Sequence, residues 1–262
     1  MYKTGKKDSL RIKIFDTRKE LGKVGAEDAA NAIKKKLAEK ESISIVFASA
    51  PSQMDVLNEL LLDNTIDWSR VNAFHMDEYI GLPAGAEQSF GQYIKVRFFD
   101  KVPLKNAFYI DGNAQDLEAE CQRYEGLLKK FGVDIVFLGI GENGHLAFND
   151  PHIANFNDQQ LVKINPQLDN QCKQQQVTDG WFGDVNEIPQ SAITLTMPAL
   201  YNADVLLTFV PGSTKREIIK KCLTEEISTA CPGSILRKHH NATLYLDQDS
   251  SSLLDPSWIG LV

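Results

Sequence analysis

The feature that most restricts the fold is the alternation of short β-rich runs with longer amphipathic runs along the chain. Residues 42–48 (SISIVFA) end in a continuous apolar stretch, which is typical of a strand buried on both faces. Residues 133–138 (VDIVFL) form the most strand-like segment, and a glycine-rich turn follows them directly. Strands that alternate with helices require right-handed crossovers, and the pattern therefore predicts a mostly parallel sheet covered by helices on both faces.

We therefore expect an α/β protein with three α/β/α layers around a mostly parallel, Rossmann-like sheet. Further strands are predicted at residues 11–15 (an edge strand), 71–74, 108–110, 191–196, 205–210 and 242–246. Helices are predicted from a capping box at residues 17–20, from Ser52, over residues 90–99 and 117–131, and from Ser213. Residues 149–189 are rich in Asn, Gln and Asp and are expected to form loop and short helices over the site. Because no Pro/Gly/Ser-rich linker divides the chain, residues 1–262 are expected to form one domain.

Charge and hydropathy exclude several classes of function. The chain has 28 Lys and Arg against 35 Asp and Glu, so a net charge of −7 argues against a nucleic-acid partner. No apolar run approaches the length of a membrane span, and residues 1–10 lack the apolar stretch of a signal peptide. The four cysteines show no C-x-x-C spacing, which is typical of free thiols in a reducing compartment. We expect a cytoplasmic protein without a membrane partner.

Ligands of parallel sheets bind at the carboxyl ends of the strands, which here are the loops after residues 48, 74, 138 and 210. The loop after residue 138 carries Gly139, Gly141 and Gly144, followed by His145. Such glycines let the backbone approach a ligand, although a lone G-x-G-x-x-G spacing is a weak signal of a dinucleotide site. His145, with Asn143 and Asp150 nearby, is a candidate general acid–base, or a histidine held only by loop hydrogen bonds.

The other three loops carry further candidates. Asp77 and Glu78 point to different sides of the chain, so one could move a proton while the other makes a structural contact. The spacing His75-x-Asp77 permits metal ligands, but no third ligand follows at a sensible distance, and we predict no metal. Lys215 lies in the first turn of an expected helix, where a cation opposes the helix dipole and suits an anion site. Two serines, at positions 49 and 52, stand at another helix start.

Four segments together resemble the glucosamine-6-phosphate deaminase (isomerase) family. They are FHMDEYIGLP (74–83), LGIGENGHLAFNDP (138–151), SAITLTMPAL (191–200) and VPGSTKREII (210–219), in the family's order. The resemblance implies conversion of an amino-sugar phosphate, such as glucosamine 6-phosphate, to fructose 6-phosphate and ammonia, without metal or cofactor. By motif match, His145 would open the sugar ring, Asp77 would move the proton from C2 to C1, and Lys215 would bind phosphate. Asn143 and Asp150 take the positions of the family's other catalytic carboxylates, and Ser49, Ser52, Glu78, Gly141 and Gly144 are the expected remaining substrate contacts. The family also suggests a homo-oligomer.

Several departures from the family pattern leave other functions open. Asp150 stands where the family has a glutamate, one methylene longer. Asn143 stands where the family has a carboxylate, so it can hold the imidazole but cannot supply negative charge. The family's phosphate loop is rich in Thr and Gly, whereas here it reads SAPSQ (49–53), without glycine. The family's phosphate-binding arginine is not found in residues 179–182 (DGWF). The family's basic allosteric residues are also not evident in residues 153–163. The alternatives are a 6-phosphogluconolactonase-like hydrolase, which shares the fold and a Gly-His loop, and a sugar-phosphate-binding sensor without catalysis.

Overall fold

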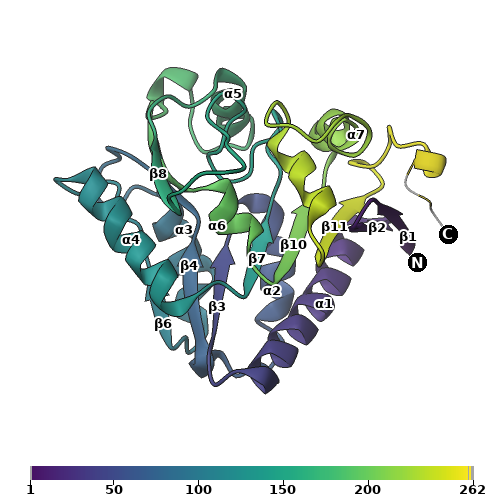
Figure 1. Cartoon of the computed structure of the whole chain (residues 1–262), viewed down its shortest axis with the longest axis horizontal. Helices are drawn as coiled ribbons and strands as arrows, with labels where there is room; N and C mark the ends of the chain where they lie inside the picture. The colour runs from purple at the N-terminus through teal and green to yellow at the C-terminus, as the bar shows by residue number, and fades with distance from the viewer. Residues whose placement is uncertain (1, 259, 261–262) are drawn as a thin grey trace.

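A computed structural model describes residues 2–258 and 260, and its centre is a mostly parallel sheet (Figure 1). Within these residues the strand order is β1-β2-β11-β10-β7-β3-β4-β6. The strands are β1 (Tyr2–Lys7), β2 (Leu10–Phe15), β3 (Ile43–Phe47), β4 (Val71–His75), β6 (Asn106–Phe108), β7 (Ile135–Leu138), β10 (Val205–Val210) and β11 (Ala242–Asp247). Every neighbouring pair is parallel except β1 with β2.

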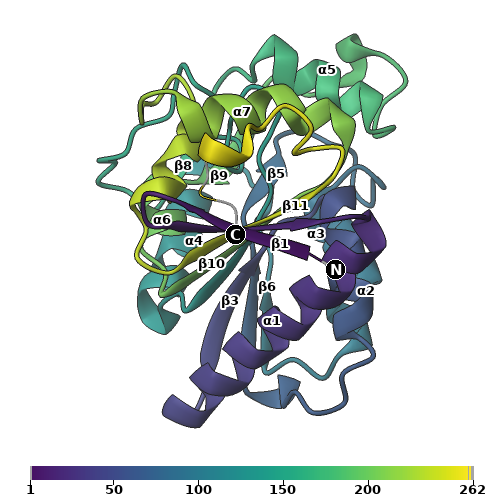
Figure 2. The same cartoon turned by 90° about the vertical axis from the view of Figure 1, so that its right-hand side faces the viewer.

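Helices cover both faces of this sheet (Figure 2). The helices α1 (Arg18–Glu39), α2 (Met54–Leu60) and α3 (Phe90–Arg97) share one apolar cluster with one face of the sheet. The helices α4 (Leu117–Phe131), α6 (Met197–Tyr201) and α7 (Arg216–Thr224) share a second cluster with the opposite face. Successive side chains of β7 alternate between the two clusters, because side chains of a strand point to opposite faces. The predicted α/β/α layering is therefore confirmed.

A smaller antiparallel sheet lies at the carboxyl ends of the main strands. It has the order β5-β9-β8, with β5 (Asp77–Tyr79), β9 (Ala192–Leu195) and β8 (Val162–Asn165). The helix α5 (Asn170–Thr178) lies in the same region, above the end toward which β3 points in Figure 1. A third apolar cluster, which includes Tyr79, Phe90 and Phe148, packs under these elements. The segment 149–189 thus lies over the site as predicted, but it contains a strand that the sequence did not indicate.

Several local predictions need correction. Residues 11–15 form a strand, but it is not an edge strand, because β1 pairs with its outer side. The predicted strand 191–196 belongs to the small sheet, and the one predicted at 108–110 is observed two residues earlier, as β6. Thr17 does cap α1 by accepting a hydrogen bond from the Glu20 amide. Ser52 and Ser213 cap neither α2 nor α7, since a short 3₁₀ turn precedes each helix and the cap positions there make no side-chain hydrogen bond.

The remaining prediction on the fold concerns membranes. Among the residues that the structure describes, every helix is too short or too polar to cross a lipid bilayer.

Candidate active site

All four predicted loops open onto one cavity of about 320 Å³ at the carboxyl ends of β3, β4, β7 and β10. These strands are neighbours in the sheet, so segments that are far apart in the sequence meet there. The cavity brings together Asp77, His145 and Lys215 with both candidate serines. Its wall is completed by residues of α1, α3, α5 and the segment after α5: Arg18, Phe90, Gln175, Gln176, Asp179 and Trp181.

His145 lies on the cavity wall and is held from behind by Asn143. The Asn143 side-chain oxygen is 2.8 Å from His145 Nδ1 and also accepts a hydrogen bond from the His145 backbone amide at 3.0 Å. The Asn143 amide nitrogen donates to Asp150 Oδ1 at 2.9 Å and to Asp169 Oδ1 at 3.2 Å. Asn143 itself carries no charge, but it connects the imidazole to two carboxylates that do.

This network determines which nitrogen of the His145 ring carries the proton. The Asn143 amide nitrogen lies between two carboxylates, so its oxygen is the atom that faces the ring. A carbonyl oxygen only accepts, and Nδ1 must therefore carry a hydrogen. In the neutral ring Nε2 is then unprotonated and free to take a proton from a ligand.

Asp150 is fully buried and its oxygens are occupied by hydrogen-bond donors. Oδ1 accepts from Asn143 and lies 3.4 Å from His145 Nδ1, while Oδ2 accepts from Asn165 and from the Asp169 amide. Burial raises the pKa of Asp150, but the hydrogen bond and positive charge of His145 and the other donors outweigh it and lower the pKa to about 2. Asp150 thus stays ionised and can stabilise a protonated His145.

Asp150, His145 and Cys172 also form a cluster whose ligand atoms lie within 4.8 Å of one another, the spacing of a metal site. The donor set does not suit a cation. Asp150 accepts four hydrogen bonds or close N–H contacts, which leaves no free lone pair directed at the cluster centre. Burial also raises the pKa of the Cys172 thiol well above its usual value, whereas metals bind the thiolate. We derive no metal chemistry from this cluster.

Asp77 and its neighbour Glu78 have different roles. Asp77 begins β5 and lines the cavity, and it is 8% exposed. Burial and the charge of Glu78 raise the pKa of Asp77 to about 8. Glu78 does not line the cavity: its carboxylate accepts hydrogen bonds from the Phe90 and Gly91 amides and the Ser89 hydroxyl at the start of α3. Glu78 is therefore held at the start of α3, and its charge contributes to the raised pKa of Asp77.

Two buried polar groups of the cavity wall are suited to an anion. Lys215 ends the 3₁₀ turn Ser213–Lys215 and is 9% exposed, and its Nζ makes no hydrogen bond within the described residues. Burial lowers the pKa of Lys215, and the nearby charges of Asp179 and Glu142 oppose that shift. The buried hydroxyl of Ser49 is likewise without a partner in the described structure, whereas Ser52 accepts a hydrogen bond from Gln53.

The two candidate glycines serve the His145 turn. Gly141 lines the cavity, and a side chain there would collide with the His145 ring, so only glycine permits this ring position. Gly144 does not line the cavity. It has a φ of 91°, and its carbonyl accepts a hydrogen bond from the Gly233 amide. Gly144 thus shapes the turn rather than contacting a ligand in the cavity.

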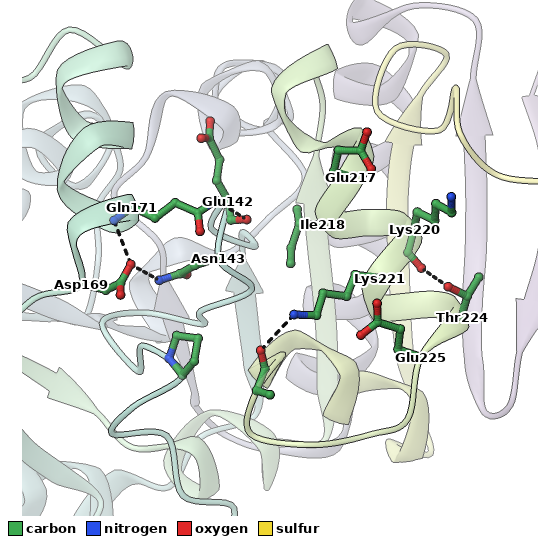
Figure 3. A pocket seen from close by; sticks show the side chains of 12 residues that line it. Glu142, Asn143, Asp169, Gln171, Glu217, Ile218, Lys220, Lys221, Thr224 and Glu225 are labelled. Carbon is green, nitrogen blue, oxygen red and sulfur yellow. Dashed lines mark hydrogen bonds between the residues drawn. The ribbon is translucent and has the colours of Figure 1, made fainter.

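A second cavity, of about 480 Å³, lies on the outer side of the same turn (Figure 3). Asn143 and Asp169 form part of its wall, and Lys220 and Lys221 of α7 line the opposite side. Its lining contains neither His145 nor Asp77. The turn at residues 141–145 therefore separates the two cavities, and the hydrogen-bond network behind the imidazole borders the outer one.

The sequence did not indicate several of the residues placed at this site, among them Arg18, Asp169 and Trp181. Arg18 reaches the cavity from the first turn of α1, where the argument applied to Lys215, a cation opposing a helix dipole, would also have selected it. Asp169 caps α5 and contacts Asn143, and nothing in the local sequence distinguishes it from an ordinary cap. Trp181 lines the cavity near Phe90 and Tyr93 and carried no signal beyond its size.

The fold is a three-layer α/β/α arrangement, and one cavity at the carboxyl ends of its parallel strands contains a histidine, a buried carboxyl group and a buried lysine. This combination is typical of enzymes that use acid–base catalysis on anionic small molecules. Comparison with known proteins identifies the family. Residues 16–245 match the model of the family described as glucosamine-6-phosphate isomerases/6-phosphogluconolactonase. The chain belongs to this family, which confirms the resemblance and the prediction of an enzyme.

The relatives agree with this assignment. Glucosamine-6-phosphate deaminases of Bacillus cereus (strain G9842) and Bacillus thuringiensis (strain Al Hakam) are each 32% identical over 93% of this chain and 89% of their own length. A solved monomeric glucosamine-6-phosphate deaminase is 29% identical, with a TM-score of 0.84 over 93% of this chain and 99% of the other. A 6-phosphogluconolactonase of Thermotoga maritima shares the fold at 21% identity, with a TM-score of 0.73 over 90% and 98% of the two chains.

Proposed function

We propose that the protein is an amino-sugar phosphate isomerase/deaminase that converts an aldose of the glucosamine 6-phosphate type to the ketose phosphate and ammonia. The observation that carries this proposal is the meeting, on one cavity, of a buried carboxyl group with a pKa of about 8 and an imidazole with a free Nε2. The reaction needs one group to move a proton at oxygen and another to move a proton between carbons, and these two groups match those needs.

In the first step, Nε2 of His145 takes the proton of the C1 hydroxyl and gives a proton to the ring oxygen, which opens the ring to the aldehyde. Asn143 holds the imidazole by its Nδ1 hydrogen, and the ionised Asp150 stabilises the imidazolium while it carries both protons. Both residues act through His145 and are positioning residues.

In the second step, Asp77 removes the C2 proton while a proton of the C2 ammonium group passes to the C1 oxygen, which forms an enolamine. Asp77 then returns its proton to C1, which leaves a protonated imine at C2. Addition of water to this imine releases ammonia and the ketose phosphate. A carboxyl group with a pKa of about 8 exchanges protons readily near neutral pH, because neither protonation state is strongly favoured. Lys215 and Ser49 would bind the phosphate group, since both are buried polar groups without a partner in the described structure.

The test is a coupled assay of ammonia and fructose 6-phosphate formed from glucosamine 6-phosphate by the purified protein. We expect equimolar products, and we expect Asp77→Asn to abolish turnover while binding of fructose 6-phosphate is kept. If no ammonia forms but 6-phosphogluconolactone is hydrolysed with release of acid, the protein is a lactonase and this proposal is wrong. Binding of sugar phosphates without any turnover would replace it with a sensor.

A further inference from the structure

One cation besides Lys215 lines the candidate site in the part of the chain that is described, and it comes from a distant segment. Arg18 is the first residue of α1, and it lines the cavity together with the loop 49–52 and Lys215. Helix α1 packs so closely on α2 that a Cβ on Gly22 would lie only 2.8 Å from the Asp55 Cβ. This close approach brings the first turn of α1 to the rim of the cavity.

The guanidinium of Arg18 is fixed on one side by the protein. Nε donates to Asp55 Oδ2 at 2.5 Å, and Nη2 donates to the Pro51 carbonyl at 2.9 Å. The loop that contains Pro51 also contains Ser49 and Ser52, which line the cavity. Since a guanidinium has five N–H donors and these two contacts use only part of them, the remaining donors are available to a ligand.

Arg18 and Lys215 are the cations of the cavity wall within the described residues, and Asp77 and Asp179 are its carboxylates. Lys215 is a buried cation without a hydrogen-bond partner among the described residues, and such a group is costly until a negative charge pairs with it. Arginine presents a planar fork that matches phosphate oxygens, whereas lysine acts as a single point of charge. Two cations of these kinds on one cavity suit a tetrahedral dianion better than a carboxylate.

We propose that Arg18 is a phosphate-binding and specificity-determining residue of this site, with its guanidinium on the phosphate group of the substrate together with Lys215. The proposal rests on the proposed function for the nature of the substrate. It also accounts for the altered site, in which residues 179–182 contain an aspartate but no arginine. The second cation is supplied from α1 instead.

The experiment measures both turnover and phosphate binding in Arg18→Gln. We expect the KM for glucosamine 6-phosphate to rise by about tenfold or more with kcat changed far less, because a charged hydrogen bond to the phosphate group is made equally in the ground and transition states. Binding of inorganic phosphate, followed by calorimetry, should weaken by a similar factor. The matched control is Lys19→Gln, which removes the same charge from the next, exposed position and should leave both values unchanged.

A second variant separates phosphate binding from the ion pair with Asp55. In the single variant the Asp55 carboxylate loses its partner and could repel phosphate by itself. The double variant Arg18→Gln/Asp55→Asn removes this charge, so phosphate binding that is still weak there excludes such an effect. Unchanged KM and phosphate binding in both variants would overturn the role of Arg18. A wild-type protein without deaminase activity, whose phosphate binding still falls on Arg18→Gln, would overturn the proposed function and leave this inference standing. A wild-type protein that binds no phosphate would overturn the phosphate site.

Discussion

Asp77 is predicted to reduce the stability of the folded protein at the pH at which it works. Its pKa is raised from the usual 3.8 to about 8, so the folded chain keeps a proton that the unfolded chain loses. Where the folded state binds more protons, the free energy of unfolding falls as pH rises. This loss begins near pH 4 and is complete above pH 8, which is the direction expected for an acid with a raised pKa.

The magnitude follows from the two pKa values. Between pH 5.5 and pH 9 the ionisation of Asp77 lowers the free energy of unfolding by about 3 kcal/mol. Asparagine has the same shape as aspartate and does not ionise. We therefore expect Asp77→Asn to become more stable relative to the wild type by about 3 kcal/mol over this pH range, while turnover is lost.

Urea unfolding followed by circular dichroism at the two pH values measures this difference. The wild-type values contain every titrating group, but their difference from the variant isolates position 77. Asp249→Asn, at an exposed position, is the control and should show a constant difference. If the difference between Asp77→Asn and the wild type is also the same at pH 5.5 and pH 9, the burial of Asp77 does not determine its ionisation and the argument fails.

Three further predictions concern turnover. Lys215→Ala should raise the KM for the sugar phosphate by about 30-fold, whereas the exposed Lys238→Ala should leave it unchanged, and steady-state kinetics of the two variants decide this. The value of kcat/KM should rise with pH and level off above about pH 8, since Asp77 must be ionised to take the C2 proton; a profile that is flat between pH 6 and 9 contradicts this assignment. Asp169→Asn keeps a residue that can cap α5 but removes one of the two carboxylates that orient Asn143, so kcat should fall several-fold with KM unchanged. Equal changes in both parameters would point to a structural role.

The layers of the fold could be predicted because the buried strands are short, apolar and bounded by clear turns. The same rule placed the site, since each of the four predicted loops lines the cavity. The strand β1 was missed because its sequence (YKTGKK) is polar and it is stabilised by pairing rather than burial. The strands β5 and β8 were missed because three or four residues carry no detectable period.

The site was only partly predictable, because its chemistry depends on contacts between distant segments. The sequence placed a hydrogen-bonding Asn143 beside His145, but it could not show that Asp169 lies on the other side of that amide. Arg18 is close to Pro51 only through the packing of α1 on α2. The single domain, the cytoplasmic location and a homo-oligomer stay predictions.

The two edge strands of the main sheet restrict how copies of this chain can associate. One edge is β1, whose short sequence contains Lys3, Lys6 and Lys7, and the other is the three-residue β6. Pairing of β1 with the β1 strand of a second copy would bring like charges together. The strand β6 offers too few amides to pair stably with a strand of another copy. Sheet extension between molecules is therefore disfavoured at both ends, which protects the folded chain from edge-to-edge aggregation. Any stable assembly would have to form through the helical layers or the loops.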